Sequence, residues 1–505
     1  MKNLFRKFRR LFNPIDLTKG QIVPTFLKFL IPIILSMIFQ QIYTLTDTVI
    51  VGQTLDSASI AGINNSATLV FVILDFAIGC SSGFSVVVSE KFGEKDDDGA
   101  RQSFLVQLVL GLIISIVLTL IGILLIPTML GWLGITKSTT GSMMQAEYEA
   151  AYTYVVIIFS GILAQMFYNL IVAVLRARGD SFTPFLFLVF STLLNVGLDL
   201  LFIVTFRWGV AGSAYATILS QTLAAIGCFI YAYKRYPELR IKKTDWKFSW
   251  KFVYKHLRLG VPLGFQFSIL AIGIIVMSSA VIKFDRVPLA DGTYELLSTM
   301  PSQIGYGAAN KLLGLLMTPL NALGTGMLSY IGQNYGAKEY GRIQKGFKYS
   351  IAICLIEWLL LMSIGLLLTI NGAYQHIFLA GDKITEESIE YGNNYLFVSL
   401  PCLGFLAVLF VSRNVLQGLQ KPLFPFLAGV AELCVRTFIC GVLPQLVTGA
   451  VITSSTPFEI YLLVCAADPI TWCISSLILT IPVLVVIFKK MPKLSNQQEG
   501  DQLAK

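Results

Sequence analysis

Asn195 and Asp199 are polar side chains inside an apolar stretch that covers residues 184–206. They are four residues apart, so a helix places them on one face. An amide beside a carboxyl group can hydrogen-bond that carboxyl in either protonation state. A carboxyl group that is shielded from bulk water but reached by water from one side can load and unload protons. The spacing therefore predicts a proton carrier, and the open alternative is a polar clamp between packed helices.

Other ionisable side chains also interrupt apolar stretches. Near the middle of a bilayer each costs about 2.5 to 3.5 kcal/mol on insertion scales, so each is a candidate functional group. We interpret Asp47 as a second coupling acid and Asp75 as a cavity residue, while a structural helix contact stays open for both. The second half of the chain contains Lys311, Glu357, Glu432, Arg436 and Asp468.

The charges of the second half differ in kind from those of the first. Glu432 precedes Arg436 by four residues, the favoured orientation for an ion pair on one helix, so we expect these two to neutralise each other. Lys311 and Asp468 are candidate counter-charges or cavity residues. Glu357 is expected near the cytoplasmic surface, where water would solvate it.

Pro32 lies about four turns before Asp47 in the first apolar stretch. A proline removes one backbone hydrogen bond and permits a bend. The bend could couple to protonation of Asp47, or it could be a static kink, because proline is common in membrane helices.

The composition predicts an all-α polytopic membrane protein. Hydrophobic residues make up 55% of the 505 residues and charged residues only 13%, and the mean hydropathy is +0.72. A soluble domain needs about twice that share of charge. About twelve apolar runs are long enough to be membrane-spanning helices. The chain has two histidines, His256 and His376, and no paired metal ligands or nucleophile with its base, so we expect no enzyme.

The basic residues predict the topology. Roughly 31 of the 38 lysines and arginines fall on one side of the predicted spans, in short loops and terminal segments. We expect that side to be the cytoplasm, with both termini cytoplasmic, in the cell membrane. The net charge of +9 then reflects topology, and no nucleic-acid partner is expected.

Two pairs of segments repeat across the chain. GFSVVVSEKFGEKDDDGARQSF begins at Gly83 and is echoed by GMLSYIGQNYGAKEYGRIQKGF at Gly326; VLRARGDSFTPF ends at Phe185 and VLQGLQKPLFPF at Phe426. The repeats predict two parallel six-helix lobes with alternating access between them. The expected domains are a cytoplasmic N-terminal segment (1–23), a first lobe (24–233), a cytoplasmic loop (234–259), a second lobe (260–488) and a cytoplasmic tail (489–505).

Several segments resemble the MATE family, the multidrug and toxic compound extrusion transporters, in their order along the chain. They are DTVIVGQ at Asp47, RARGDSFTP at Arg176, NVGLDLLFI at Asn195, GVAGSAYATILSQ at Gly209 and IGQNYGAKEYGR at Ile331. The resemblance implies a V-shaped pair of six-helix bundles. It also implies export of amphipathic, often cationic, small molecules in exchange for protons or sodium. We expect membrane lipids around the protein, and we expect it to be a monomer.

The resemblance also implies a set of working residues in the first lobe. The coupling site would comprise Asp47, Asn195, Asp199 and Thr217, with Gln40 and Asn169 in the substrate cavity and Pro32 as the bend. Gln40, Asn169 and Thr217 come from the resemblance alone. Asp75 is unusual for the family.

The coupling ion has two candidates. A proton is expected from the buried acids. Sodium could instead use the oxygens of Asp47, Asn195, Asp199 and Thr217, because hard cations prefer oxygen ligands. Family members with a second-lobe sodium site have acids that are missing from the matching helices here. The alternative function is a lipid-linked saccharide flippase of the same superfamily, although such proteins need a cationic cavity and this first lobe contains acids.

Overall fold

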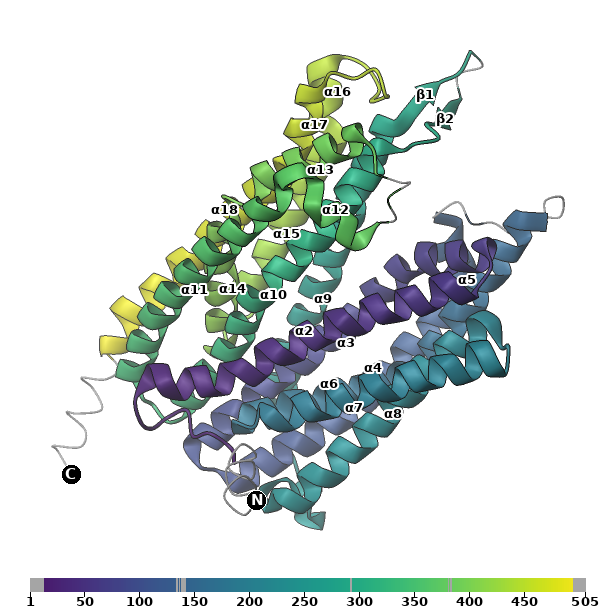
Figure 1. Ribbon diagram of the computed structural model, residues 1–505. Helices are drawn as coiled ribbons and strands as arrows, with labels where there is room; N and C mark the ends of the chain where they lie inside the picture. The colour runs from purple at the N-terminus through teal and green to yellow at the C-terminus, as the bar shows by residue number, and fades with distance from the viewer. Residues whose placement is uncertain are drawn as a thin grey trace, which may run out of the picture. The chain divides into compact units, whose positions relative to one another are not determined.

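Helices make up most of the computed structural model, which describes residues 13–132, 135, 137, 142–290, 293–379, 381 and 384–493 (Figure 1). Residues 1–12 and 494–505 of the predicted terminal segments lie outside the described residues. Ten helices in the described part are long and apolar enough to cross a membrane. Two further pairs of helices, bent by 47° and 54° at a short break, bring the number to twelve. The prediction of an all-α polytopic membrane protein is therefore confirmed.

The chain packs as two units. Unit 1 comprises residues 1–268, 328–342 and 417–422, and unit 2 comprises residues 269–327, 343–416 and 423–505. Helices that begin in one unit and end in the other include α9 (Trp250–Val281) and α10 (Pro301–Gly336). The predicted lobe boundaries stay predictions. Helix α9 begins inside the predicted loop 234–259, because no proline or glycine interrupts the residues from Trp250 to Arg258.

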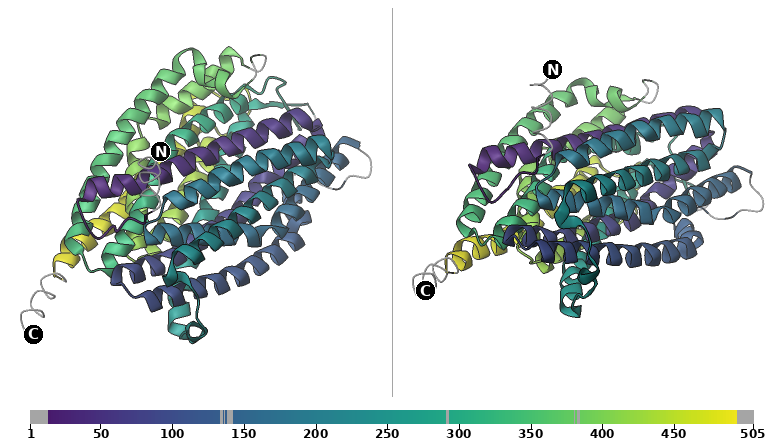
Figure 2. Two further views of the ribbon diagram at one scale, coloured as in Figure 1. Left: turned by 60° about the horizontal axis from the view of Figure 1, so that its bottom comes forward. Right: turned by 90° about the horizontal axis from the view of Figure 1, so that it is seen from below.

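Unit 1 is built from long helices that pack side by side (Figure 2). Helix α3 packs against α4, α5 and α6, and α7 packs against α2 and α8. The helices are α2 (Ile22–Thr54), α3 (Ser57–Glu94), α4 (Asp97–Trp132), α5 (Ser142–Ser160), α6 (Ile162–Arg178), α7 (Phe182–Asp199) and α8 (Gly209–Arg235). A π-helical segment, Leu200–Thr205, follows α7, and 3-10 turns follow α8 at Pro237–Leu239 and Lys243–Trp246.

Unit 2 is also built from helices, and several of them are shorter than those of unit 1. The helices that lie wholly in unit 2 are α12 (Ala373–Phe378), α13 (Glu386–Ser399), α15 (Leu423–Thr437), α16 (Leu443–Thr448), α17 (Phe458–Cys465) and α18 (Ala467–Leu484), and those that lie mostly in it are α11 (Tyr340–Thr369) and α14 (Leu403–Gly418). Its π-helical segments are Phe438–Val442 and Val485–Lys490, and its 3-10 turns are Ile282–Asp285 and Ile370–Gly372. Strands β1 (Arg286–Pro288) and β2 (Tyr294–Leu296) form a short antiparallel ribbon, in which Arg286 is opposite Leu296.

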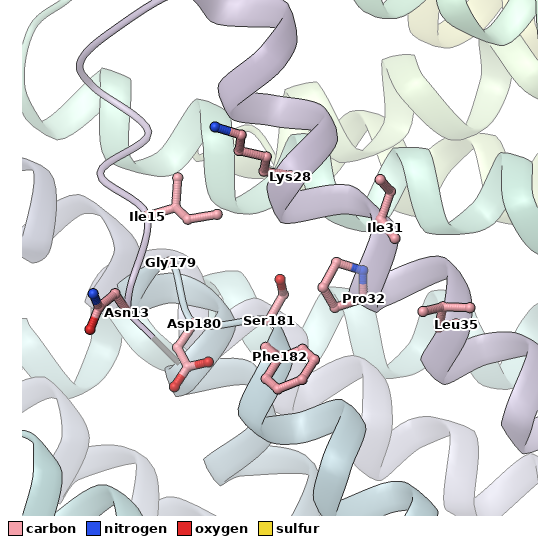
Figure 3. Close-up of a pocket in the computed structure, with 10 residues that line it drawn as sticks. All are labelled: Asn13, Ile15, Lys28, Ile31, Pro32, Leu35, Gly179, Asp180, Ser181 and Phe182. Atoms are coloured by element: carbon pink, nitrogen blue, oxygen red, sulfur yellow. The ribbon is translucent and has the colours of Figure 1, made fainter. Parts of the chain in front are cut away.

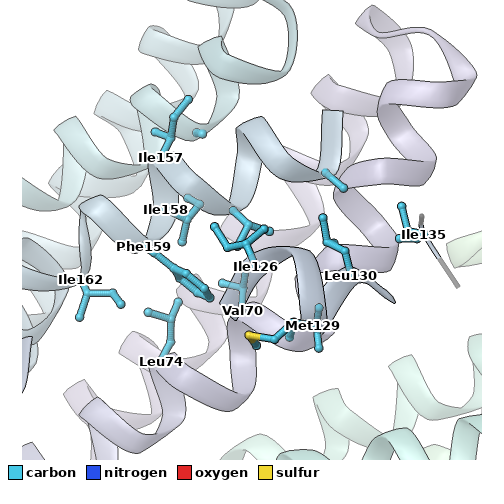
Figure 4. Packing of buried hydrophobic residues seen from close by; sticks show 14 residues of the cluster. Val70, Leu74, Ile126, Met129, Leu130, Ile135, Ile157, Ile158, Phe159 and Ile162 are labelled. Carbon is cyan, nitrogen blue, oxygen red and sulfur yellow. The ribbon is translucent and has the colours of Figure 1, made fainter. Parts of the chain in front are cut away.

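A cluster of aliphatic side chains fixes the helices of unit 1 (Figure 4). Val70 and Leu74 of α3 meet Ile126 and Leu130 of α4, and Phe159 of α5 fills the space between them. Lipid is as apolar as these side chains, so close packing, and not exclusion from water, stabilises the contact. The cluster gives the polar side chains of unit 1 a rigid frame.

Glycines allow α3 and α9 to approach closely within unit 1. A Cβ atom at Gly79 would meet the backbone of Leu263 and Gly264, and one at Gly83 would meet the backbone of Gly260. Such small residues are typical of tightly packed membrane helices. Any larger residue at Gly79 or Gly83 would force these helices apart.

Candidate functional site

Helix α7 buries Asn195 and Asp199 one turn apart at its end. Both side chains have 0% exposure, and the π-helical segment Leu200–Thr205 starts directly after Asp199. Single π-helical turns inside helices are frequent at functional sites because they redirect neighbouring side chains. The second repeat has a π-helical segment after α15, at Phe438–Val442. Both repeats thus contain a π-helical segment here, but only in the first repeat does an acid come directly before it.

Asp47 on α2 faces Asp199. The two carboxyl groups lie close enough to interact with each other. Two ionised carboxylates have no proton to share, so a hydrogen bond between them forms only when one is protonated. The predicted acids of α2 and α7 are therefore brought together in one site.

Two tyrosines that sequence reasoning missed belong to the same site. Tyr43 lies one turn before Asp47 on α2, and its hydroxyl is 3.3 Å from Oγ1 of Thr217 on α8. Tyr154 of α5 lies near both Asp47 and Asp199. The spacing of Tyr43 and Asp47 on one helix face was an available signal for Tyr43. Nothing local in the sequence indicates Tyr154, which comes from a distant helix.

The polar atoms of this site lack partners. Oδ1 of Asp47, both carboxyl oxygens of Asp199 and both amide atoms of Asn195 are buried without a hydrogen bond in the described structure. No lysine or arginine among the described residues forms an ion pair with either acid. Burying an unpaired carboxylate is costly. A proton or a cation bound between the carboxyl groups would remove that cost.

Three predicted cavity residues lie on α2, α3 and α6 of unit 1. Gln40 is exposed, about two turns before Asp47 on α2, and Asn169 on α6 and Asp75 on α3 are partly buried. No hydrogen bond or ion pair connects these three side chains to the acids in the part of the chain that the structure describes. Pro32 lies inside α2, where the sequence predicted a bend. The roles of these residues stay predictions.

Two ion pairs join buried charges of unit 2. Nη2 of Arg413 is 2.9 Å from Oε1 of Glu432, and Nη2 of Arg436 is 2.8 Å from Oδ1 of Asp468. The predicted attraction between Glu432 and Arg436 is present, but neither residue has the other as its direct ion-pair partner among the described residues. Each finds its partner on another helix, because buried charges need direct contact and helices α14 and α18 supply it. Arg413 was missed, since nothing in the sequence shows that it faces Glu432.

Further hydrogen bonds complete the unit 2 network. The hydroxyl of Tyr395 donates to Oδ2 of Asp468 at 2.8 Å. Gly273 makes room for Arg436, because a Cβ atom at Gly273 would meet the guanidinium group. Asp468 is thus a counter-charge, one of the two roles predicted for it, while Lys311 is exposed on α10. Glu357 is partly exposed, but one of its carboxyl oxygens is buried without a partner, so the predicted solvation does not extend to that oxygen.

Comparison with known proteins gives consistent matches. The family model described as MatE matches residues 32–201 and 305–443, more than half of the chain. The probable multidrug resistance protein YpnP of Bacillus subtilis is 30% identical over 329 residues, which cover 65% of this chain and 68% of that protein. The probable multidrug resistance protein YoeA of Bacillus subtilis is 24% identical over 379 residues, covering 74% and 76%.

Solved structures share the fold. A crystal structure of a MATE protein in the bent conformation matches with a TM-score of 0.79 at 21% identity, covering 95% of this chain and 99% of that one. A MATE protein in the straight conformation matches with a TM-score of 0.76 at 20% identity and the same coverage. With the family model, these matches establish that the chain belongs to the MATE family of multidrug efflux transporters and is not an enzyme.

Proposed function

We propose that this protein is an antiporter that exports amphipathic, often cationic, small molecules in exchange for protons. The observation that carries the proposal is the facing pair of Asp47 and Asp199, whose buried oxygens have no cation or hydrogen-bond donor within the described structure. An acid pair of this kind binds one positive charge at a time. A proton from outside and a cationic substrate from inside would therefore compete for it.

The coupling follows from the positions of the two acids. A proton bound to either carboxyl group allows Asp47 and Asp199 to hydrogen-bond, which would hold α2 against α7. Without the proton the two negative charges repel each other, and α2 would separate from α7 around Pro32. Alternation between these two states would open the cavity to one side of the membrane at a time.

The energy of one proton is sufficient for useful export. A charge that moves through about 100 mV releases ~2.3 kcal/mol. This energy supports roughly a fifty-fold concentration gradient of one neutral substrate per proton. Sodium is the alternative coupling ion, since Asp47, Asn195, Asp199 and Thr217 supply the oxygens that a hard cation prefers.

The orientation that we propose places both termini in the cytoplasm of a cell whose plasma membrane contains the protein. This proposal rests on the distribution of lysine and arginine among the loops. We further propose that the protein works as a monomer surrounded by membrane lipids, because each unit has buried apolar side chains of its own.

The test is transport by purified protein in liposomes. Efflux of a fluorescent organic cation is measured under an imposed pH gradient or sodium gradient for the wild type and for Asp199→Asn. The matched control is Asp56→Asn, because Asp56 is an exposed acid that caps α3 and asparagine caps a helix equally well.

The proposal predicts pH-driven efflux that Asp199→Asn abolishes and Asp56→Asn leaves intact. Efflux driven only by sodium would show that sodium, and not the proton, is the coupling ion. The proposed site would still stand. Wild-type protein that transports nothing under either gradient would contradict drug export and would favour the flippase alternative.

A further inference from the structure

A pocket of about 380 Å³ lies between the N-terminal part of α2 and the turn that joins α6 to α7 (Figure 3). This volume is within the range of about 300 to 1,000 Å³ that is typical of small-molecule sites. The pocket is lined by Asn13, Ile15, Lys28, Ile31, Pro32, Leu35, Gly179, Asp180, Ser181 and Phe182. It belongs to unit 1 and contains none of the acids that we assign to coupling.

Hydrogen bonds hold the walls of the pocket in place. The backbone N–H of Ile15 donates to the carbonyl of Gly179 at 2.9 Å, and Oγ of Ser181 donates to the carbonyl of Phe29 at 2.6 Å. Leu17, just beyond the pocket, is anchored by Oε1 of Gln333 at 3.2 Å. The pocket is therefore preformed and does not depend on a ligand for its shape.

The lining combines an apolar wall with a free cation. Ile31 and Leu35 expose 54% and 38% of their surface, and the aromatic side chain of Phe182 also lines the pocket (Figure 3). The exposed ammonium group of Lys28 has no ion pair or hydrogen bond within the described residues. On another wall, Nη2 of Arg235 donates to Oδ1 of Asn13 at 3.3 Å, which brings a second cation near.

The one acid in the lining does not oppose an anion. The carboxyl group of Asp180 accepts hydrogen bonds from the backbone N–H of Thr183 at 3.0 Å and from its hydroxyl at 2.6 Å. It also accepts one from the hydroxyl of Tyr236 at 2.6 Å. These three donors fix the carboxyl group of Asp180 and offset its charge.

We propose that this pocket binds an anionic phospholipid, with the phosphate at Lys28 and an acyl chain along Ile31, Leu35 and Phe182. The ligand needs one negative group and an apolar chain at once, which matches the lining. Lysines near the ends of membrane helices extend toward the headgroup region, where anionic phosphate is available.

The pocket lies where α2 lacks one backbone hydrogen bond. In a regular helix the carbonyl of Lys28 accepts a hydrogen bond from the N–H of residue 32, and Pro32 has no N–H. Both residues line the pocket. A lipid bound there contacts both sides of the missing bond and so biases the bend of α2. This effect on transport rests on the proposed function, whereas lipid binding itself does not.

Binding is tested first, without any transport. Purified protein in detergent is titrated with phosphatidylglycerol or phosphatidylcholine, and bound lipid is counted by native mass spectrometry. We expect preference for phosphatidylglycerol, weakened about fivefold by Lys28→Gln, which removes one lysine–phosphate attraction. Ile31→Trp places a larger side chain in the pocket and leaves less room for the acyl chain, so it should also weaken binding. Lys251→Gln, at an exposed lysine outside the pocket, should leave binding unchanged.

Three results would overturn the site: equal binding of the two lipids, equal effects of Lys28→Gln and Lys251→Gln, or no effect of Ile31→Trp. Lys28 and Ile31 are exposed, so the lipid-free variants should unfold at the wild-type temperature, and this control separates lost binding from misfolding.

Transport is tested second, in liposomes of phosphatidylcholine with and without phosphatidylglycerol. The wild-type rate should depend on the lipid composition, and Lys28→Gln should remove that dependence. If no liposome supports transport while phosphatidylglycerol still binds through Lys28, the antiport mechanism fails and the lipid site stands. If phosphatidylglycerol shows no preference in the binding experiment, the lipid site fails whatever the transport result.

Discussion

Arg436 of α15 and Asp468 of α18 form a buried ion pair within unit 2, with Nε and Nη2 of the arginine 3.0 and 2.8 Å from Oδ1 of the aspartate. The two residues expose 6% and 8% of their surface. Tyr395 donates to the other carboxyl oxygen, so the carboxylate is fully partnered. Asp468 thus differs from Asp47 and Asp199, whose buried oxygens have no such partners.

Removal of one partner should destabilise unit 2. Arg436→Met leaves Asp468 charged, buried and unpaired, and breaking a buried pair in this way costs about 3 to 5 kcal/mol. The double variant Arg436→Met/Asp468→Leu should recover most of that loss. Thermal unfolding in detergent measures both. Lys311→Met is the control at an exposed cation, and a loss as large for Lys311→Met as for Arg436→Met would contradict this account.

Asp47→Asn and Asp199→Asn should not be additive. If the two acids share one proton, each single substitution already removes the shared site, and the double variant loses no further activity. Efflux rates under a pH gradient give the comparison. If the double variant lowered the efflux rate by the product of the two single factors, the acids would act independently.

Pro32→Ala should slow transport while stabilising α2. The substitution restores an N–H that can bond to the carbonyl of Lys28, which stiffens the helix at its proposed bend. Pro127→Ala is the matched control, because Pro127 also lies inside a long helix, α4. The measurements are the efflux rate and the unfolding temperature. Similar slowing by both substitutions would exclude a specific role for Pro32.

The ionisation of Asp245, which lies outside the membrane-spanning segments, should make the stability of the fold depend on pH. Burial raises the pKa of Asp245, but hydrogen bonds from the Lys242 N–H and from the Arg101 guanidinium outweigh burial and lower it below its usual value. The interaction with Arg101, at 2.7 Å, therefore stabilises the fold in full above the unfolded-state pKa of about 3.9. This stability is lost as the pH falls through the lower native pKa.

The check is the unfolding temperature of wild type and Asp245→Asn as a function of pH. The wild type should be more stable at neutral pH, and the difference should shrink below about pH 4. A difference that is constant across this range would show that ionisation of Asp245 does not contribute.

The membrane-spanning helices and the polar pair of α7 could be predicted because their signals are local. Apolar length identifies a membrane helix, and a four-residue spacing places Asn195 and Asp199 on one face. Partners across helices could not be predicted in this way. The local rule paired Glu432 with Arg436, but tertiary packing supplied Arg413 and Asp468 instead. The same limit hid Tyr154, which no periodicity connects to Asp47.

The paired charges of unit 2 have an electrical consequence. An ion pair that moves as a unit carries no net charge through the transmembrane field, so the field does no work on it. The charges cancel in this sense within each of the two pairs, Arg413 with Glu432 and Arg436 with Asp468. Under the proposed mechanism, these two ion pairs therefore add nothing to the dependence of transport on membrane voltage, whereas Asp47, Asp199 and the charge of the substrate contribute to it.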